Sequence, residues 1–357
     1  MASQPGIPDT MRVSVLERPG QLQLTERPVP RPAAGHVLVA VRSVGVCGSD
    51  VHYFQHGRIG DFVVRAPLVL GHEVSGVVAA VGAGVAGDRV GSRVAIEPGA
   101  ACGACAPCKA GRYNLCPQMR FFATPPVDGA LAEYVEVRAD LAFALPDAVS
   151  DDAAALLEPL SVGIWATGKA GLTPGGSVLI AGAGPIGLVT AQVARARGAA
   201  TIVVSDIAPD RLAAAERSGA TATVLAGAGQ DGGADGGGDS AAAGPGPEFD
   251  AFIDCSGAAS AVTAGLRMLR PAGTAVLVGM GADELPLPLG LIQRYELTVT
   301  GTFRYANTWP AAIALAASGA VDIDALVTDR YPLDQADAAL TATTRPGTIK
   351  SIIEPWR

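Results

Sequence analysis

A glycine-rich turn between two apolar segments constrains the fold of this chain more than any other feature of its sequence. Val178–Ala181 reads as a strand buried on both faces, and Thr201–Ser205 reads as a second strand that ends at Asp206. Three glycines in the pattern G-x-G-x-x-G and a predicted helix separate the two strands: Gly182, Gly184, Gly187 and Leu188–Arg197. This strand–helix–strand unit predicts a doubly wound parallel sheet that binds a nucleotide.

The spacing of this unit gives each residue a physical role. Gly182 permits a tight turn, Gly184 lets a pyrophosphate approach the backbone, and Gly187 lets the helix pack on the strand. The N-terminus of the helix offers free N–H groups to phosphates, and Asp206 stands where an acid binds a ribose hydroxyl. Because strands, helix and acid are all present, we predict dinucleotide binding, against the alternative of a purely structural turn.

No charged residue lies between Lys169 and Arg195, a length that also suits a membrane span. Glycines and Pro185 interrupt this run, and strand-like residues give way to a helical pattern after them. A buried strand–helix core explains the run better. We therefore expect a soluble protein with no membrane partner.

Length and charge exclude further classes. The 357 residues are 49% hydrophobic and 17% charged, which predicts two domains with a sizeable core. A net charge of −8 argues against a nucleic-acid partner. The segment Met1–Met11 has no apolar run of the secretory kind. We therefore expect a cytoplasmic protein whose cysteines stay reduced and are read first as metal ligands.

Four cysteines follow the pattern C-x2-C-x2-C-x7-C: Cys102, Cys105, Cys108 and Cys116. Four thiolates in so short a segment suit a closed tetrahedral zinc site with a structural role, within a lobe at about 98–118. An iron–sulfur cluster is the alternative that the same ligands permit. Disulfides are disfavoured by the expected compartment.

Cys47, His72 and Glu73 offer a thiolate, an imidazole and a carboxylate upstream of the dinucleotide unit. These are the ligand types of a catalytic zinc that keeps one position open. Each residue alone has an ordinary structural interpretation, but their co-occurrence favours a metal. Since neighbouring side chains of a strand point to opposite faces, His72 and Glu73 can both bind only if the backbone turns there. Glu158 lies between Leu157 and Pro159 in an apolar segment. A carboxylate buried there needs a partner, such as a metal or a metal-bound water.

The remaining segments predict a β-rich first region and alternating strands and helices after Asp206. Residues 226–247 are low in complexity, and we expect a mobile loop without catalytic role. The alternation of strands and helices after Asp206 implies parallel strands joined by helices. The predicted elements are strands at Val13–Leu16, Val37–Val44, Thr221–Leu225, Phe249–Ser256, Thr274–Gly279 and Leu297–Gly301, helices at Pro209–Ser218, Ser260–Leu269 and Trp309–Ala320, a helix that begins at Asp151 after Ser150, and a last strand, Ile349–Ile353, that returns to the first domain.

Over nearly its whole length the chain resembles the zinc-dependent medium-chain dehydrogenases, and among them the sorbitol (polyol, L-iditol 2-) dehydrogenases. The low-complexity insert is the clearest departure. The resemblance rests on seven segments: Gly45–Tyr53, Gly57–Phe62, Gly71–Gly76, Gly111–Leu115, Ala123–Pro126, Glu158–Gly163 and Gly301–Pro310.

This resemblance implies a GroES-like catalytic domain at 1–159 and 305–357, and an NAD-binding Rossmann domain at 160–304. It implies a catalytic zinc on Cys47, His72 and Glu73, with Glu158 as a further ligand or as the holder of the zinc-bound water. Ser49 and His52 resemble a proton relay. Matching positions for the polyol are Tyr53, Phe121, Thr124, Glu158, Arg304 and Tyr305, and for NAD they are Gly182, Gly184, Pro185, Ile186, Gly187, Asp206, Arg211, Val278, Gly279, Met280, Phe303 and Arg304.

The function implied is oxidation of a polyol secondary alcohol to a ketose, of the sorbitol-to-fructose or xylitol-to-xylulose type, by a homotetramer. Two rivals remain. One is another zinc dehydrogenase of the same superfamily, acting on threonine or a simple alcohol. The other is a nonenzymatic zinc-binding module built on the four cysteines, which leaves the dinucleotide unit unexplained.

Overall fold

The computed structural model describes residues 6–227 and 248–357, which cluster in two compact units. The first unit comprises Met1–Ser161 and Ala306–Arg357, and the second comprises Val162–Tyr305. The loop expected at 226–247 lies almost entirely outside the described residues. In the part of the chain that the structure covers, no helix is long and apolar enough to cross a membrane.

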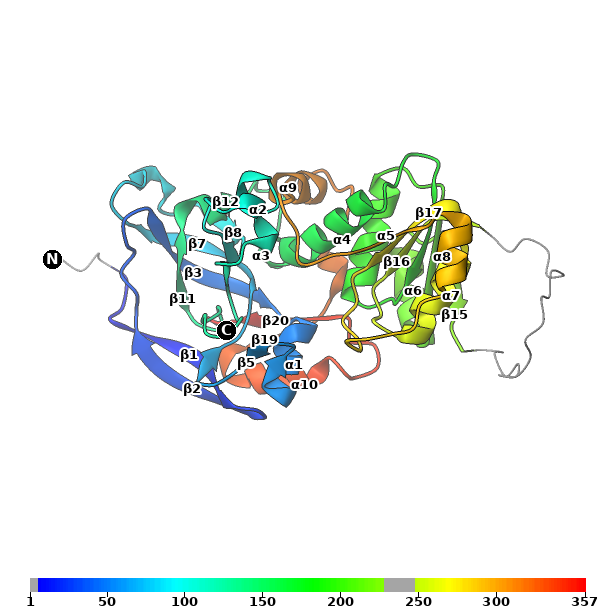
Figure 1. Ribbon diagram of the computed structural model, residues 1–357. Helices are drawn as coiled ribbons and strands as arrows, with labels where there is room; N and C mark the ends of the chain where they lie inside the picture. Colours follow the sequence, from blue (N-terminus) through cyan, green and yellow to red (C-terminus); the bar gives the residue numbers. More distant parts are fainter. Residues whose placement is uncertain (1–5, 228–247) are drawn as a thin grey trace. The chain divides into compact units, whose positions relative to one another are not determined.

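The second unit contains a six-stranded sheet accompanied by helices (Figure 1). Its strand order is β15-β14-β13-β16-β17-β18, and every pairing is parallel. This order, with the first strand in the middle, is that of a dinucleotide-binding fold, and it confirms the predicted parallel sheet. The elements are β13 (Ser177–Ala181), β14 (Thr201–Asp206), β15 (Ala222–Leu225), β16 (Phe249–Asp254), β17 (Leu269–Leu277), β18 (Thr298–Gly301), α4 (Leu157–Lys169, which begins in the first unit), α5 (Pro185–Ala196), α6 (Pro209–Arg217), α7 (Ala259–Arg267) and α8 (Leu289–Tyr295).

Helix α5 begins three residues earlier than the expected start at Leu188. Its first residue is Pro185, and Gly184 is the N-cap. A proline at the first helical position lacks only an N–H that would have no partner in the helix anyway, so it starts a helix well. The prediction was wrong because it assigned the Gly-Pro step to the loop. The correction places Ile186 and Gly187 in the first turn of α5.

The first unit is rich in strands. Its main sheet has the order β12-β8-β7-β3-β20-β19, with β11 paired to β3, and a smaller sheet has the order β2-β1-β6. The strands are β1 (Thr10–Arg18), β2 (Gln21–Pro28), β3 (His36–Gly45), β4 (Arg58–Ile59), β5 (Phe62–Val63), β6 (Leu68–Val69), β7 (Glu73–Val81), β8 (Arg93–Ile96), β9 (Gly99–Ala100), β10 (Arg120–Phe121), β11 (Tyr134–Arg138), β12 (Ala142–Ala144), β19 (Val327–Pro332) and β20 (Lys350–Glu354).

Several helices accompany these strands. The sequence patterns did not predict α1, whereas Ser150 caps α3 as expected, its hydroxyl accepting from the Ala153 N–H at 2.9 Å. The helices of the first unit are α1 (Gly48–His56), α2 (Ala106–Lys109), α3 (Asp151–Ala155), α9 (Trp309–Ala317) and α10 (Ala336–Ala342), with single 3-10 turns at Gly87–Arg89, Tyr113–Leu115, Ala139–Leu141, Asp324–Leu326 and Leu333–Gln335.

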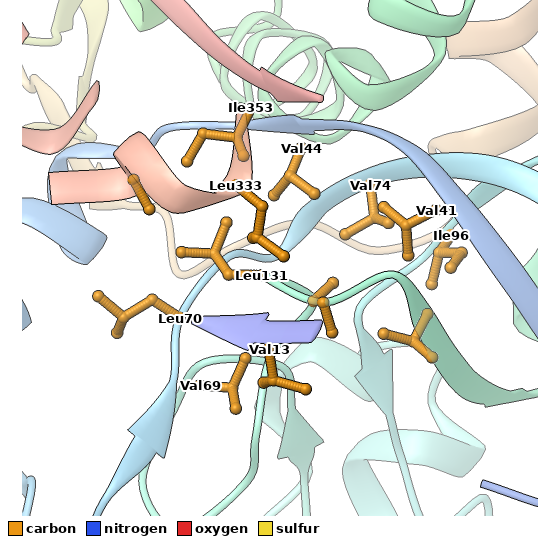
Figure 2. Packing of buried hydrophobic residues seen from close by; sticks show 14 of the residues in the cluster. Val13, Val41, Val44, Val69, Leu70, Val74, Ile96, Leu131, Leu333 and Ile353 are labelled. Atoms are coloured by element: carbon orange, nitrogen blue, oxygen red, sulfur yellow. The ribbon is translucent and has the colours of Figure 1, made fainter. Parts of the chain in front are cut away.

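The core of the first unit is aliphatic. Figure 2 shows side chains from β1, β3, β6, β7 and β20 packed together with Leu131 and Leu333. Val44, Leu70 and Ile353 in this cluster are fully buried. Each such side chain contributes about 1.5–3 kcal/mol relative to an exposed position. This rigid core holds the ends of β3 and β7, where the candidate metal ligands lie.

The last strand returns to the first unit, as predicted. β20 pairs with β3 in an antiparallel register that sets Ile352 opposite Gly45 and Ile353 opposite Val44. Because β3 ends two residues before Cys47, this pairing brings the C-terminal segment of the chain beside the candidate metal ligands. Lys350, the first residue of β20, is thereby buried in the first unit.

Candidate active site

Three candidate ligands from two strand ends converge in the first unit. One ligand atom from each of Cys47, His72 and Glu73 lies within 4.8 Å of the others. Cys47 is the N-cap of α1, two residues after the end of β3. Gly71 has a φ of +88°, and β7 begins only at Glu73. His72 therefore precedes the strand, which explains how two neighbouring residues approach the same point.

His72 is held by Asp50, a residue that the sequence analysis did not single out. Its Nδ1 lies 3.6 Å from Asp50 Oδ1, and both side chains are buried. Asp50 also accepts from the N–H groups of Gly71 at 3.0 Å and Cys47 at 3.1 Å. A carboxylate on Nδ1 orients the ring and leaves Nε2 for a metal. The sequence did carry a signal: an acid three residues after an N-cap, as in a capping box.

The charges around His72 favour a cation. Burial alone would lower the pKa of His72, but the nearby Asp50 and Cys47 raise it well above its ordinary value. Burial likewise would raise the pKa of Asp50, yet His72 and the two backbone N–H groups hold it below its usual range. A site with these charges attracts positive charge, as a dication site requires.

Glu73 has one paired oxygen and one unpaired oxygen. Its Oε1 accepts from Lys350 Nζ at 2.6 Å, whereas its buried Oε2 has no hydrogen-bond partner among the described residues. A Cβ at Gly45 would come within 2.0 Å of this Oε2, so glycine is needed there. An orphaned carboxylate oxygen beside a thiol and an imidazole fits a metal ion, and the three residues present thus fit a catalytic zinc with an open position.

The other predicted catalytic and substrate residues lie in both units. Glu158 is buried at the start of α4 and is not in the three-residue ligand group. Ser49 is half-buried and His52 exposed, both on α1. The Phe121 ring lies 5.7 Å from the His72 ring, centroid to centroid. Tyr53 is buried and Thr124 half-buried in the first unit, whereas the half-buried Arg304 and the buried Tyr305 belong to the second unit.

The four cysteines of the predicted lobe form a second ligand group, whose sulfur atoms all lie within 4.8 Å of one another. Cys105 Sγ lies 3.3 Å from Cys108 Sγ, and Cys102 Sγ lies 4.0 Å from Cys108 Sγ, with all four thiols free. Four sulfurs at about 2.3 Å from a zinc would be about 3.8 Å apart. Backbone N–H groups of Ala104 and Cys105 lower the pKa of the Cys102 thiol to about 6. The lobe therefore fits a closed metal site.

Replacing Cys105 by serine should remove about one metal ion per chain and lower the thermal midpoint by about 5–10 °C, because a closed site contributes folding free energy. Elemental analysis and a thermal melt measure the two quantities. Cys255→Ser, in the second unit, is the matched control and should change neither. An unchanged metal count and midpoint in Cys105→Ser would rule out a structural metal.

A buried carboxyl group lies near this lobe. Glu97 follows β8, and its Oε1 accepts from the Tyr113 hydroxyl at 2.7 Å. The Tyr113 hydroxyl in turn accepts from the Asn307 backbone N–H at 2.9 Å. Burial raises the pKa of Glu97 to about 7, although the bond from Tyr113 lowers it. Asn307 has a positive φ of 59°, so these bonds hold an unusual backbone conformation next to Tyr305.

Glu97 should make stability fall as pH rises from about 5 to 8. Its folded pKa lies above the ordinary value of 4.5, so the unfolded chain releases the proton first and the penalty is complete above the folded pKa. Glu97→Gln should remove this dependence, which amounts to at most about 3 kcal/mol in the free energy of unfolding between the two pH values. Thermal midpoints at pH 5 and pH 8 test it, with the exposed Glu26→Gln as control. Parallel pH profiles for wild type and Glu97→Gln would contradict the assignment.

The glycine turn in the second unit has the geometry that its pattern predicts. Gly182 has a φ of +95°, and a Cβ on it would lie 3.1 Å from the Cys255 backbone. A Cβ on Gly184 would meet nothing within 4 Å, so this N-cap faces open space that a pyrophosphate could fill. A Cβ on Gly187 would lie 1.8 Å from the Gly182 carbonyl oxygen. The positive φ and the close packing thus fall on the two glycines for which the pattern predicts them.

Asp206 closes this turn from the end of β14. Its Oδ2 accepts from the Ala183 N–H at 2.6 Å and its Oδ1 from the Ala208 N–H at 2.9 Å. The neighbouring Ile207 is 80% exposed, an apolar surface beside the acid. The other predicted cofactor residues also lie in the second unit: Pro185, Ile186 and Arg211 are half-buried, as are Val278, Gly279 and Arg304, while Met280 and Phe303 are exposed. These residues fit a dinucleotide on the carboxyl edge of the sheet.

Two family models match the chain: the alcohol dehydrogenase GroES-like domain over residues 33–147 and the zinc-binding dehydrogenase over residues 185–318. The chain is 44% identical to a sorbitol dehydrogenase of Gallus gallus over 349 residues, which covers 95% of each chain. It is also 44% identical over 353 residues, 95% of each chain, to a protein named probable D-xylulose reductase A from Aspergillus clavatus.

Solved structures agree with these matches. A short chain alcohol dehydrogenase of Escherichia coli CFT073, complexed with NADH, has a TM-score of 0.87 and 30% identity, covering 97% of this chain and 100% of that chain. A zinc-binding dehydrogenase of Sinorhizobium meliloti 1021, bound to NADP, has a TM-score of 0.88 and 32% identity. The match covers 98% of this chain and 100% of that chain. The chain therefore belongs to the zinc-dependent medium-chain dehydrogenase superfamily, with a GroES-like and a Rossmann-type domain.

Proposed function

We propose that this chain oxidises a secondary hydroxyl of a polyol to a ketose, with one catalytic zinc and NAD. The observation that carries the proposal is the convergence of Cys47, His72 and Glu73 in a chain 44% identical to a sorbitol dehydrogenase. One oxygen of Glu73 has no hydrogen-bond partner among the residues that the structure describes. The glycine turn in the second unit would bind the nicotinamide cofactor that a dehydrogenase also needs. The roles assigned are catalytic for 1–159 and 305–357 and cofactor-binding for 160–304.

Cys47, His72 and Glu73 would hold the catalytic zinc, and Asp50 orients the His72 ring. When bound, the metal supplies Lewis-acid chemistry that lowers the pKa of a substrate hydroxyl, and the nicotinamide accepts hydride. Three ligands are one fewer than a closed structural zinc takes, so these residues would leave room at the metal for a substrate oxygen. A nonenzymatic zinc module would need no open position.

The remaining residues of this chain bind the polyol and move its proton. The buried Glu158 holds a water or the reacting hydroxyl next to the metal ligands. The half-buried Ser49 and the exposed His52 stand one helical turn apart on α1, and they carry the released proton from the interior to solvent. Tyr53, Phe121, Thr124, Arg304 and Tyr305 contact the polyol.

The cofactor binds along the glycine turn, at Gly182, Gly184, Pro185, Ile186 and Gly187. Further contacts come from the end of β14 and from the loops that follow β17 and β18. These contact residues are Asp206, Arg211, Val278, Gly279, Met280, Phe303 and Arg304. We also infer a structural zinc on the four cysteines of the lobe, and a cytoplasmic homotetramer.

A substrate panel tests this proposal. The zinc-loaded protein is incubated with NAD and, separately, with sorbitol, xylitol, L-threonine and a simple alcohol, and the absorbance of reduced cofactor is followed. We expect kcat/KM for a polyol to exceed the values for threonine and the simple alcohol. A higher value for either of those would favour the alternative, another zinc-dependent dehydrogenase of the superfamily.

A further inference from the structure

We propose that Lys350 is the resident counter-ion of Glu73: it neutralises this buried carboxylate when the metal is absent and competes with the metal for it. By this competition Lys350 limits the affinity of the Cys47–His72–Glu73 centre for its metal. The inference rests on the metal centre of the proposed function. Lys350 is a positioning residue, since it acts through Glu73.

The geometry of the pair is that of a buried ion pair. Lys350 Nζ donates to Glu73 Oε1 at 2.6 Å and to the Val46 carbonyl oxygen at 2.8 Å. The side chains of Lys350 and Glu73 are only 3% and 1% exposed. The Val46 carbonyl belongs to the residue before Cys47, so the ammonium is fixed to the same backbone that carries the thiol ligand.

The other carboxylate oxygen stays available. Glu73 Oε2 has no hydrogen-bond partner within the described parts of the chain, and it fills the space beside Gly45. A buried carboxylate with one oxygen on an ammonium and one unpaired is only half satisfied. The unpaired oxygen belongs to the ligand group with Cys47 and His72. One oxygen of the Glu73 carboxylate thus binds the ammonium group of Lys350, and the other remains available to an exchangeable metal ion.

Electrostatics gives the direction of the effect. An ammonium beside the ligand group repels an incoming dication and draws electron density from the shared carboxylate, and both effects weaken metal binding. Lys350 Nζ lies 2.6 Å from Glu73 Oε1 and both side chains are buried, so this ion pair stands directly beside the ligand group. Among the described residues, Lys350 is the only cation paired with Glu73. Without it a bound metal would supply the counter-charge, and an unpaired buried charge is destabilising. Removing Lys350 should therefore make the metal-free protein less stable and the metal bind more tightly.

The test measures zinc directly, on the full-length protein. Lys350→Met and Lys350→Gln remove the charge, with Gln keeping a hydrogen-bond donor, and Lys350→Arg keeps the charge. Competition with a chelating dye should show about tenfold tighter zinc binding at the catalytic site in Met and Gln, and wild-type affinity in Arg. Thermal melts with and without zinc should show a larger metal-dependent gain in Met and Gln than in wild type. Lys169→Met, in the second unit, is the matched charge control and should resemble wild type.

The outcomes separate this inference from the proposed function. Equal or weaker zinc binding in both Lys350→Met and Lys350→Gln would overturn it, since a merely structural ion pair would leave the affinity unchanged. Cys47→Ser is measured in parallel. If Cys47→Ser holds as many zinc ions as wild type, the metal centre itself is wrong. If Cys47→Ser loses one ion while the Lys350 variants bind zinc like wild type, only the role of Lys350 is refuted.

Discussion

Replacing Cys47 by serine, or His72 by alanine, is expected to reduce polyol turnover by a factor on the order of a thousand or more. A Lewis acid on the reacting hydroxyl supplies several kcal/mol of transition-state stabilisation, and each 1.4 kcal/mol is about tenfold in rate. Serine is a poor zinc ligand beside a thiolate, and alanine removes the imidazole entirely. The measurement is kcat with the preferred polyol and NAD, with metal content determined on the same samples.

The fold and NAD binding should survive these changes. Cys47 and His72 lie at the ends of elements, and the aliphatic core of the first unit does not include them. The dinucleotide turn belongs to the second unit. Thermal melts and cofactor titration check both properties, and Cys255→Ser is the cysteine control, expected to retain turnover. Near-normal turnover of either variant with its zinc removed would refute the zinc mechanism.

The parts of the fold that sequence predicted are those encoded by local patterns. In the second unit, β13 and β14 are short segments rich in apolar, β-branched residues, and the glycine spacing between them fixes where the chain turns and where it packs closely. The structure places a positive φ at Gly182 and the close packing at Gly187, as the pattern requires. The parallel direction of the six strands follows from alternating strands and helices, whereas their order does not.

Helix α1 was missed because its pattern is short and mixed. Gly48–His56 is only 9 residues long, with polar and apolar residues interleaved, inside a segment otherwise full of strands. Its packing in the first unit, with Val51, Tyr53 and Phe54 buried, stabilises it where local propensity does not. Asp50 was missed with it, because the function of an acid at the third helical position depends on the histidine that it faces.

Lys350 could not have been found from spacing. It lies 277 residues from Glu73 along the chain, and only the pairing of β20 with β3 brings the two together. The adjacency of His72 and Glu73 in the sequence does require the backbone to turn if both are to reach one ion. It could not say how the turn is made. In the structure, Gly71 makes the turn with a φ of +88°, and β7 begins at Glu73, one residue after His72.

The enzyme should prefer NAD over NADP by about a thousandfold in kcat/KM. NADP carries a phosphate on the ribose 2′ oxygen, where an acid at the end of the second strand binds the NAD hydroxyl. Two like charges about 4 Å apart repel by roughly 4 kcal/mol at an effective dielectric near 20, which is about a thousandfold. The carboxylate of Asp206 accepts hydrogen bonds from the N–H groups of Ala183 and Ala208. Moving the carboxylate away from a phosphate would break these bonds and therefore cost free energy. Arg211, on α6, would reduce the repulsion only by turning toward the phosphate.

Two substitutions of Asp206 separate its charge from its support of the glycine turn. Asp206→Ala removes both, and it should weaken NAD and admit NADP, since Ala183 loses its hydrogen-bond acceptor as the charge disappears. Asp206→Asn keeps an oxygen for Ala183 but no charge, so it should admit NADP with a smaller loss for NAD. Steady-state kinetics with both cofactors measure the two ratios. One structural relative was solved with NADP and another with NADH, so both cofactors are measured with each variant. A wild-type enzyme with comparable kcat/KM for the two cofactors would refute the role of Asp206.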